Sequence, residues 1–239
     1  MATFVIIHGG WGGGWIFQAM ARRLRVAGHE VYTPTLTGMG DRIHLAHPEI
    51  DLDAHVLDVV NMLYAEDLRD VLLVGYSYGG MVLTGVAERV PERLAHLIYL
   101  DAFVPHNGES LLDLLAPEAR SVLEDSFRQS DDGWRDSHDL PRPWPNPIPP
   151  RLAPHPWKTF TQPLKVLSEA AAMPPRTYVR CTSDKGSGEF MGQSFALSYM
   201  RAQAAGWRIL EVEGDHNSPK TEQSADWLLQ LFDPLLSQN

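Results

Sequence analysis

The chain has 239 residues, of which 44% are hydrophobic and 21% charged. This composition fits one ordinary globular domain and excludes a disordered, collagen-like or coiled-coil chain. The formal net charge of −10 at pH 7 argues against binding to nucleic acid or to an anionic membrane surface. A single cysteine, Cys181, excludes an internal disulfide framework and is compatible with a reducing compartment.

The amino-terminal segment predicts no export signal. Its apolar stretch, residues 1–7, runs directly into a glycine-rich loop, whereas a signal peptide needs a basic start, an apolar region and a small-residue cleavage site. No apolar run approaches the ~20 residues of a membrane span. We therefore expect a cytoplasmic protein, or one whose targeting is not visible in the sequence.

Short apolar runs alternate with segments of helical period along the first hundred residues. The expected strands are 4–7, 30–33, 71–74 and 97–100, and the expected helices are 15–27, 52–63 and 81–89. This alternation predicts a parallel sheet with right-handed crossovers. The first strand is continuously apolar, as expected of a strand covered on both faces.

The alternation breaks after Pro105. Six of the ten residues 141–150 are proline, a density that neither a helix nor a central strand tolerates. A linker between two domains is one interpretation. The later chain, however, resumes the alternation, with strands at 177–181 and 207–212 and a closing helix at 221–236. We predict one α/β domain, residues 1–105 and 166–239, with a mostly parallel sheet of about six strands and an inserted cap at 106–165.

The motif GYSYG at 75–79 follows an expected strand and precedes an expected helix. In a G-x-S-x-G pattern the glycines allow the strained turn that presents a serine hydroxyl at a helix N-terminus. Ser77 is therefore a candidate nucleophile. An ordinary serine helix cap in a strand-to-helix turn is the alternative interpretation.

A serine nucleophile needs a base and a carboxylate. The order Ser…Asp…His predicts a histidine after the last strand, and of ten histidines His216 alone has this position. Most of the others are expected at the surface. Asp184, after the strand at 177–181, is the preferred acid; Asp101, after the strand at 97–100, is its main competitor. Asp215 adjoins His216 but is expected to point elsewhere.

The glycine-rich loop HGGWGGG at 8–14 follows the first strand. A phosphate-binding loop is the rival interpretation, but no Lys-Ser or Lys-Thr follows, and Trp15 and Phe17 occupy the candidate third-glycine positions of G-x-G-x-x-G. An oxyanion hole fits better, with N–H groups from Gly10 and from Tyr78, the residue after the nucleophile.

A metal site finds little support. His44 and His47 lie near Asp51 and Asp53, but no H-E-x-x-H motif or cysteine pair occurs, so a solvated loop is the expected role. We expect no metal or cofactor. Cys181, in an expected strand, is interpreted as a packing residue.

The chain resembles α/β-hydrolases of the group that contains plant methyl-ester esterases, hydroxynitrile lyases and bacterial pyrethroid-type carboxylesterases. The resemblance rests on the segments HGGWGGGW, AGHEVYTPTLTGMGDR, GYSYGGMV, YLDAFVP, RCTSDKG and GDH, and is weakest across 106–155. It implies an α/β-hydrolase fold with Ser77, Asp184 and His216 as the triad and Gly10 and Tyr78 as oxyanion donors.

The resemblance also argues against three related activities. Hydroxynitrile lyases of this group carry a threonine and a lysine where this chain has Gly9 and Asn217, so cyanohydrin cleavage is not expected. Dehalogenases and epoxide hydrolases of this fold use an aspartate nucleophile, whereas this chain has Ser77.

We therefore expect a serine hydrolase that cleaves a carboxylic ester through an acyl-enzyme. Aromatic residues suggest an apolar or aromatic small-molecule substrate; the candidate pocket residues are Trp11, Tyr76, Trp144, Trp157 and Phe160. Amide or carbamate hydrolysis by the same triad is one alternative, and a non-catalytic, receptor-like binding protein is another. By analogy with its relatives, the chain is a candidate homodimer.

Overall fold

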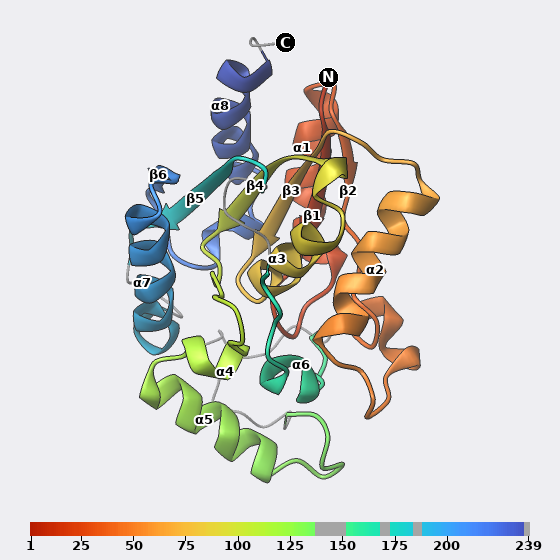
Figure 1. Ribbon diagram of the computed structural model, residues 1–239, viewed down its shortest axis with the longest axis vertical. Coiled ribbons are helices and arrows are strands. Elements are labelled where there is room, and N and C mark those ends of the chain that lie inside the picture. Colours follow the sequence, from red (N-terminus) through yellow and green to blue (C-terminus); the bar gives the residue numbers. More distant parts are fainter. Residues whose placement is uncertain (137–151, 168–172, 184–187, 237–239) are drawn as a thin grey trace.

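A parallel β-sheet forms the centre of the computed structural model, which describes residues 1–136, 152–167, 173–183 and 188–236 (Figure 1). Its strands are β1 (Thr3–Ile7), β2 (Glu30–Tyr32), β3 (Val71–Tyr76), β4 (Leu94–Leu100), β5 (Arg176–Cys181) and β6 (Arg208–Val212). They lie in the order β2-β1-β3-β4-β5-β6, and every pairing is parallel. The predicted α/β fold is confirmed.

Helices cover both faces of this sheet. The core helices are α1 (Gln18–Val26), α2 (Leu52–Ala65), α3 (Gly79–Arg89), α7 (Gly188–Ala204) and α8 (Ser224–Leu236). In β1, the side chains of Val5 and Ile7 pack in the cluster that includes α2 and α3, and those of Phe4 and Ile6 pack in the cluster that includes α1 and α8. All four are fully buried, which confirms that β1 is covered on both faces.

The first helix differs from its expected single span of 15–27. A 3-10 turn at Gly14–Phe17 precedes α1. Gly14 lies so close to the chain after β2 that a Cβ on it would be 1.9 Å from the Thr33 carbonyl oxygen. The glycine therefore allows the loop after β1 to pass against the end of β2. None of the described helices combines the length and apolar character that a membrane span requires.

The segment 106–165 is called the cap segment below, and its described parts, 106–136 and 152–165, lie beyond the carboxyl ends of the strands (Figure 1). It contains α4 (Leu111–Leu114), α5 (Pro117–Arg128) and α6 (Lys158–Thr161). Backbone hydrogen bonds between Leu164 and Gly108 (2.8 Å) and between Leu164 and Glu109 (2.9 Å) bring its two ends together. The segment thus leaves and re-enters the sheet domain at one place. The proline-rich stretch 141–150 lies outside the described residues.

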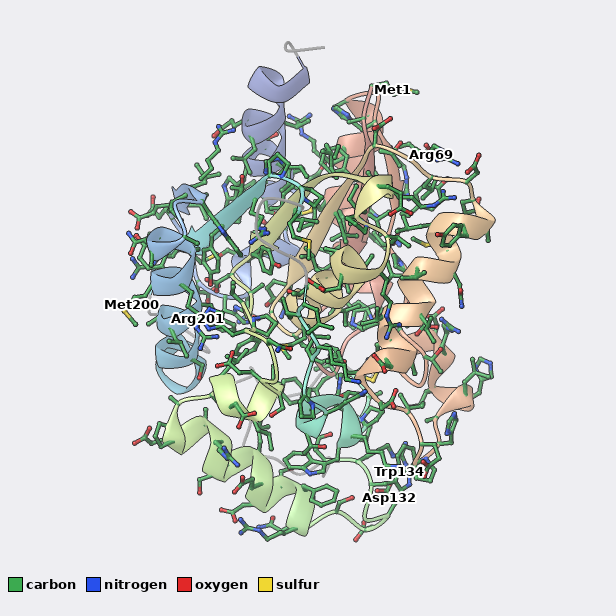
Figure 2. The ribbon with its side chains drawn as sticks, in the orientation of Figure 1. Met1, Arg69, Asp132, Trp134, Met200 and Arg201 are labelled. Carbon is green, nitrogen blue, oxygen red and sulfur yellow. The ribbon has the colours of Figure 1, made fainter. Side chains whose placement is uncertain are left out.

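An ion pair also joins the cap segment to helix α7 of the core. Arg201 of α7, labelled in Figure 2, donates two hydrogen bonds to the Glu109 carboxylate, at 2.6 and 2.8 Å. Asp132 and Trp134, after α5, lie at the end of the molecule opposite Met1 (Figure 2). The carboxyl edge of the sheet is therefore covered by chain that starts and ends beside α7.

Candidate active site

Ser77 lies in a sharp turn between β3 and α3. Its φ of 55° is left-handed, a conformation that side chains rarely adopt. A Cβ on Gly75 would lie 2.6 Å from the Gly79 carbonyl oxygen, and a Cβ on Gly79 would lie 2.7 Å from that of Ile7. Both motif glycines are therefore required by close backbone packing. The left-handed backbone of Ser77 differs from the extended backbone typical of a helix N-cap, which argues against the alternative of a serine cap.

His216 lies in the loop after β6, and its ring is held on both faces. Tyr76 stacks on one face with a centroid distance of 4.7 Å, and Phe195 of α7 stacks at 4.5 Å. The Tyr76 hydroxyl also donates a 2.5 Å hydrogen bond to the His216 carbonyl oxygen. Because Tyr76 immediately precedes Ser77, these contacts bring the histidine loop to the strand that carries the serine.

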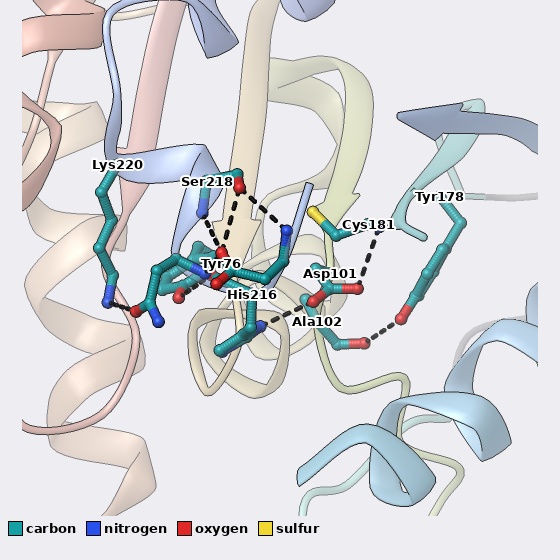
Figure 3. Close-up of polar contacts among 10 residues, drawn as sticks. Tyr76, Asp101, Ala102, Tyr178, Cys181, His216, Ser218 and Lys220 are labelled. Carbon is teal, nitrogen blue, oxygen red and sulfur yellow. Dashed lines mark hydrogen bonds and ion pairs between the residues drawn. The ribbon is translucent and has the colours of Figure 1, made fainter. Parts of the chain in front are cut away.

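The carboxylate that contacts His216 is that of Asp101 (Figure 3). Asp101 Oδ2 lies 2.7 Å from His216 Nδ1, and both side chains are buried. Asp101 itself is fixed at the end of β4, since its N–H donates to the Val179 carbonyl oxygen at 2.8 Å and its Oδ1 accepts weakly from the Cys181 N–H at 3.4 Å. Nδ1 carries a single hydrogen, and among the described residues its carboxylate partner is Asp101, the competitor named from the sequence.

Asp184 itself lies outside the described residues, and its catalytic role stays a prediction. Asp215 points away from the imidazole, as expected. Its Oδ1 accepts from the backbone N–H groups of Asn217 (2.9 Å) and Ser218 (3.0 Å). This carboxylate therefore shapes the turn that carries His216. Beside it, Lys220 donates to the Asn217 side chain at 2.6 Å, and burial lowers the pKa of Lys220 to about 8.

His8 fixes the start of the glycine-rich loop. Its Nδ1–H donates to the Gly9 carbonyl oxygen at 2.7 Å, and its Nε2 accepts from the Leu36 N–H at 3.1 Å. Burial lowers the pKa of His8 to about 4, which keeps this neutral tautomer at pH 7. A trans peptide places its N–H opposite its carbonyl. His8 therefore sets the direction of the Gly10 N–H.

Tyr78, the other expected oxyanion donor, is anchored by its side chain. Its hydroxyl lies 2.9 Å from His55 Nδ1, and His55 Nε2 lies 2.9 Å from the Thr37 carbonyl oxygen. Burial lowers the pKa of His55 to about 4, so Nε2–H donates to Thr37 and Nδ1 accepts from Tyr78. The Tyr78 N–H, at the start of α3, is among those without a partner inside the helix.

Four of the other histidines are buried: His8, His55, His96 and His155. Their hydrogen-bond partners come from segments distant in sequence, which a single-residue pattern does not reveal. His44 and His47 are exposed, as a solvated loop predicts. Among the residues that the structure describes, no three His, Cys, Asp or Glu side chains gather as a metal site.

The candidate pocket residues are packed more tightly than expected. Tyr76 and Phe160 are almost fully buried. Trp157 stacks on Phe127 with a centroid distance of 4.6 Å, and the Trp11 indole N–H donates to Asp136. Trp144 lies outside the described residues. The four described rings thus already have packing or hydrogen-bonding partners around the site.

Residues 4–227 match the alpha/beta hydrolase family. This chain belongs to that family. The match covers both the sheet domain and the cap segment, and it includes Ser77, Asp101 and His216. The resemblance stated from the sequence motifs is confirmed.

Relatives of this alpha/beta hydrolase include a carbendazim hydrolyzing esterase from Nocardioides, 54% identical over 115 residues that are 48% of each chain. Methylesterase 10 of Arabidopsis thaliana is 35% identical over 107 residues, 44% of this chain and 38% of the relative. The matches thus span about half or less of these curated relatives.

Two solved structures show the same fold. One is an extracellular alpha/beta-hydrolase from Paenibacillus, with a TM-score of 0.77 and 23% identity, covering 96% of this chain and 98% of that one. The other is a pyrethroid hydrolase from Sphingobium faniae, with a TM-score of 0.72 and 22% identity, covering 97% of each. At this identity the likeness concerns the fold alone.

Proposed function

We propose that this alpha/beta hydrolase is a serine esterase that cleaves a carboxylic ester or carbamate through an acyl-enzyme. The observation that carries the proposal is the buried His216–Asp101 pair, which is stacked on Tyr76 directly beside Ser77. Nucleophilic acyl transfer needs a serine and an imidazole oriented by a carboxylate. Ser77 in its left-handed strand-to-helix turn, with the neighbouring Tyr76 ring stacked on His216, supports this arrangement.

The proton path follows from the tautomer of His216. Because Nδ1–H donates to Asp101, Nε2 is left as the acceptor that takes the Ser77 proton when the hydroxyl attacks the substrate carbonyl. The same Nε2 then gives that proton to the leaving alcohol or amine. Water then attacks the acyl carbon and gives a proton to His216. When the bond to Ser77 Oγ breaks, His216 returns that proton to Oγ and the acid is released. Asp101 stabilises the imidazolium in each half-reaction and keeps its own negative charge.

The negative oxygen of each tetrahedral intermediate requires N–H donors. The Gly10 N–H is directed by His8 through the Gly9 carbonyl, and the Tyr78 N–H belongs to the first turn of α3. The Trp11 N–H already donates to His155, which supports Gly10 as the donor from this loop. Each such donor contributes ~2.7–4 kcal/mol to the transition state.

Carbamate hydrolysis is favoured as the second activity of the same site. It is supported by the 54% identity to a carbendazim hydrolyzing esterase. The attack and the oxyanion are the same for a carbamate and an ester, and only the carbonyl substituents differ. The proposed substrate is therefore a small apolar or aromatic ester or carbamate.

The environment of Gly9 supports hydrolysis over cyanohydrin cleavage. A Cβ on Gly9 would lie 2.9 Å from the Ser77 Cβ and 3.0 Å from the Tyr76 ring, so a threonine, the residue of the lyases at this position, does not fit. Asn217 in place of the lyase lysine agrees, since its side chain binds Lys220.

A pre-steady-state assay tests this function. Wild type and Ser77→Ala are compared on p-nitrophenyl esters of increasing acyl length and on a matched aryl carbamate, with the exposed Ser121→Ala as control. We expect a burst equal to the enzyme concentration in wild type and control, and no turnover in Ser77→Ala. Binding without turnover in wild type would favour a receptor, and activity in Ser77→Ala would overturn the nucleophile.

A further inference from the structure

Trp11, the residue after Gly10, has an unusual backbone conformation. Its φ is 61°, in the left-handed region that bulky side chains rarely occupy. Such a conformation persists only where the surroundings over-determine it, and it clusters at sites where geometry matters for function. The contacts of Trp11 therefore indicate what holds this loop.

Three hydrogen bonds join Trp11 to the cap segment. Its backbone N–H donates to His155 Nδ1 at 3.2 Å, and its carbonyl oxygen accepts from the Ala153 N–H at 3.0 Å. Its indole N–H donates to a carboxylate oxygen of Asp136. The loop of the sheet domain is thus fixed, one residue from the proposed oxyanion donor, by groups from the cap segment.

Asp136 joins these contacts into one unit. It is buried, at 2% exposure. One of its oxygens accepts from the Trp11 indole, and the other accepts from the His155 N–H at 2.5 Å. The Asp136 N–H in turn donates to the His155 carbonyl oxygen at 3.1 Å. A buried carboxylate is tolerated when its oxygens are hydrogen-bonded, and here those bonds connect Trp11 to His155.

The same unit contacts both proposed oxyanion residues. The His155 ring stacks on Phe160 at 4.3 Å, with an interplanar angle of 11°. Tyr78 packs edge-on against both rings, with centroid distances of 4.8 Å to His155 and 5.6 Å to Phe160. A Cβ on Gly10 would lie 3.7 Å from Phe160 and 3.9 Å from His155. The stack therefore lies against Gly10 and Tyr78 together.

We propose that Asp136 and His155 are positioning residues of the oxyanion hole. Through Trp11 they hold the Gly10 N–H where it can donate to the developing oxyanion, so the hole is complete only with the cap segment in place. The inference rests on the proposed acyl-transfer function. Since the oxyanion exists only in the transition state and the intermediates, loss of these contacts reduces kcat and leaves KM nearly unchanged.

Trp11→Phe tests the contact directly, because it keeps an aromatic ring and removes the indole N–H. We expect kcat on a p-nitrophenyl ester to fall by roughly 10–100-fold, with KM within about twofold of wild type. The matched control is Trp207→Phe, which should keep the wild-type kcat. The Trp207 ring packs at a tilt against Tyr99 of β4, with a centroid distance of 4.9 Å.

A pair of variants at His155 tests the acceptor. His155→Ala removes Nδ1, and His155→Asn restores an acceptor oxygen near its place. We expect His155→Asn to recover most of the kcat that His155→Ala loses. Equal losses in both variants would contradict the acceptor role of Nδ1.

An ester and its thionoester separate positioning from simple damage. Sulfur is a poorer hydrogen-bond acceptor than oxygen, so misplaced donors reduce the rate on the oxygen ester more. We expect the ester-to-thionoester rate ratio to fall in Trp11→Phe. Asp136→Asn, in which we expect the same fall, is the second variant to measure if Trp11→Phe does not fold. An unchanged ratio in folded variants would overturn the positioning role. Absence of wild-type turnover would instead contradict the proposed function itself.

Discussion

Asp101 Oδ2 lies 2.7 Å from His216 Nδ1 although 115 positions separate the two residues in the sequence. Tyr76 of β3 pairs with Leu100 of β4, and the Tyr76 ring stacks on His216, so the end of β4 lies beside the histidine. Ser77 directly follows β3, and Asp101 directly follows β4. Both residues have a left-handed backbone conformation, with φ of 55° and 45°. The proposed nucleophile and the proposed acid therefore lie side by side at the carboxyl ends of two adjacent strands.

Asp101→Asn tests this relationship. The amide keeps the size of the carboxylate but removes its charge and alters the preferred tautomer of His216, so we expect kcat to fall by about 10³–10⁴-fold with little change in KM. Steady-state kinetics on a p-nitrophenyl ester, together with a circular dichroism spectrum to establish folding, provide the measurement.

The matched control for that substitution is Asp184→Asn. With Asp101 on His216, we expect the Asp184 variant to keep most of the wild-type kcat. The reverse pattern, a collapse of kcat in Asp184→Asn and a small effect in Asp101→Asn, would return the catalytic role to the carboxylate that the family resemblance implies.

The contrast between Ser77 and Asp101 shows which site residues a sequence reveals. Ser77 was predictable because its strained turn depends on glycines within two residues of it. The acid is different, since the ends of β4 and β5 are neighbours and either could carry it. Which carboxylate reaches His216 depends on the direction of a side chain after a strand, and no local motif encodes that direction.

Helix α7 and the buried histidines show the same limit in the fold. The sequence of α7, GEFMGQSFALSYMRAQA, contains two glycines, which disfavour helix, and its apolar residues give no clear helical stripe. His55 is buried because the Thr37 carbonyl and the Tyr78 hydroxyl satisfy its ring. Both partners become neighbours only in the folded chain.

Gly9→Thr should inactivate the enzyme and create no lyase. The added Cβ would lie 2.9 Å from the Ser77 Cβ, closer than real Cβ contacts, so the loop or the nucleophile must move. We expect esterase kcat to fall by about 10²-fold or more, with cyanohydrin cleavage, followed as aldehyde release, at the background rate. As a control, the exposed Ser121→Ala should keep the wild-type kcat. Measurable lyase turnover in Gly9→Thr would contradict our interpretation.

Tyr76→Phe should loosen the His216 loop. The substitution keeps the stacked ring and removes the hydroxyl that donates to the His216 carbonyl oxygen. Leaving that buried acceptor without its donor costs about 1–3 kcal/mol of unfolding free energy. Thermal denaturation should show a Tm lower by several degrees, and kcat should fall less than in Asp101→Asn. The control Tyr64→Phe, at a half-exposed ring, should keep the wild-type Tm. An unchanged Tm in Tyr76→Phe would show that the hydrogen bond to the His216 carbonyl contributes nothing to stability.

The buried histidines predict that the protein loses stability in mild acid. Burial lowers the pKa of His8, His55 and His96 to about 4 in the folded chain, against about 6.5 when unfolded. Between these two values the unfolded chain binds protons that the folded chain does not, so the free energy of unfolding falls as the pH falls from 6.5 to 4. Above pH 6.5 these groups contribute no pH dependence.

The slope of the unfolding free energy against pH gives the number of protons that the chain binds on unfolding. Each histidine that charges only on unfolding contributes up to about 1.36 kcal/mol per pH unit. In urea titrations between pH 4 and 6.5, His96→Gln should lower the slope by the contribution of one histidine. The control Ser121→Ala, at an exposed position, should keep the wild-type slope. A flat wild-type profile across this range would mean that the buried imidazoles accept protons without unfolding, and the neutral tautomers assigned to His8 and His55 would then be wrong.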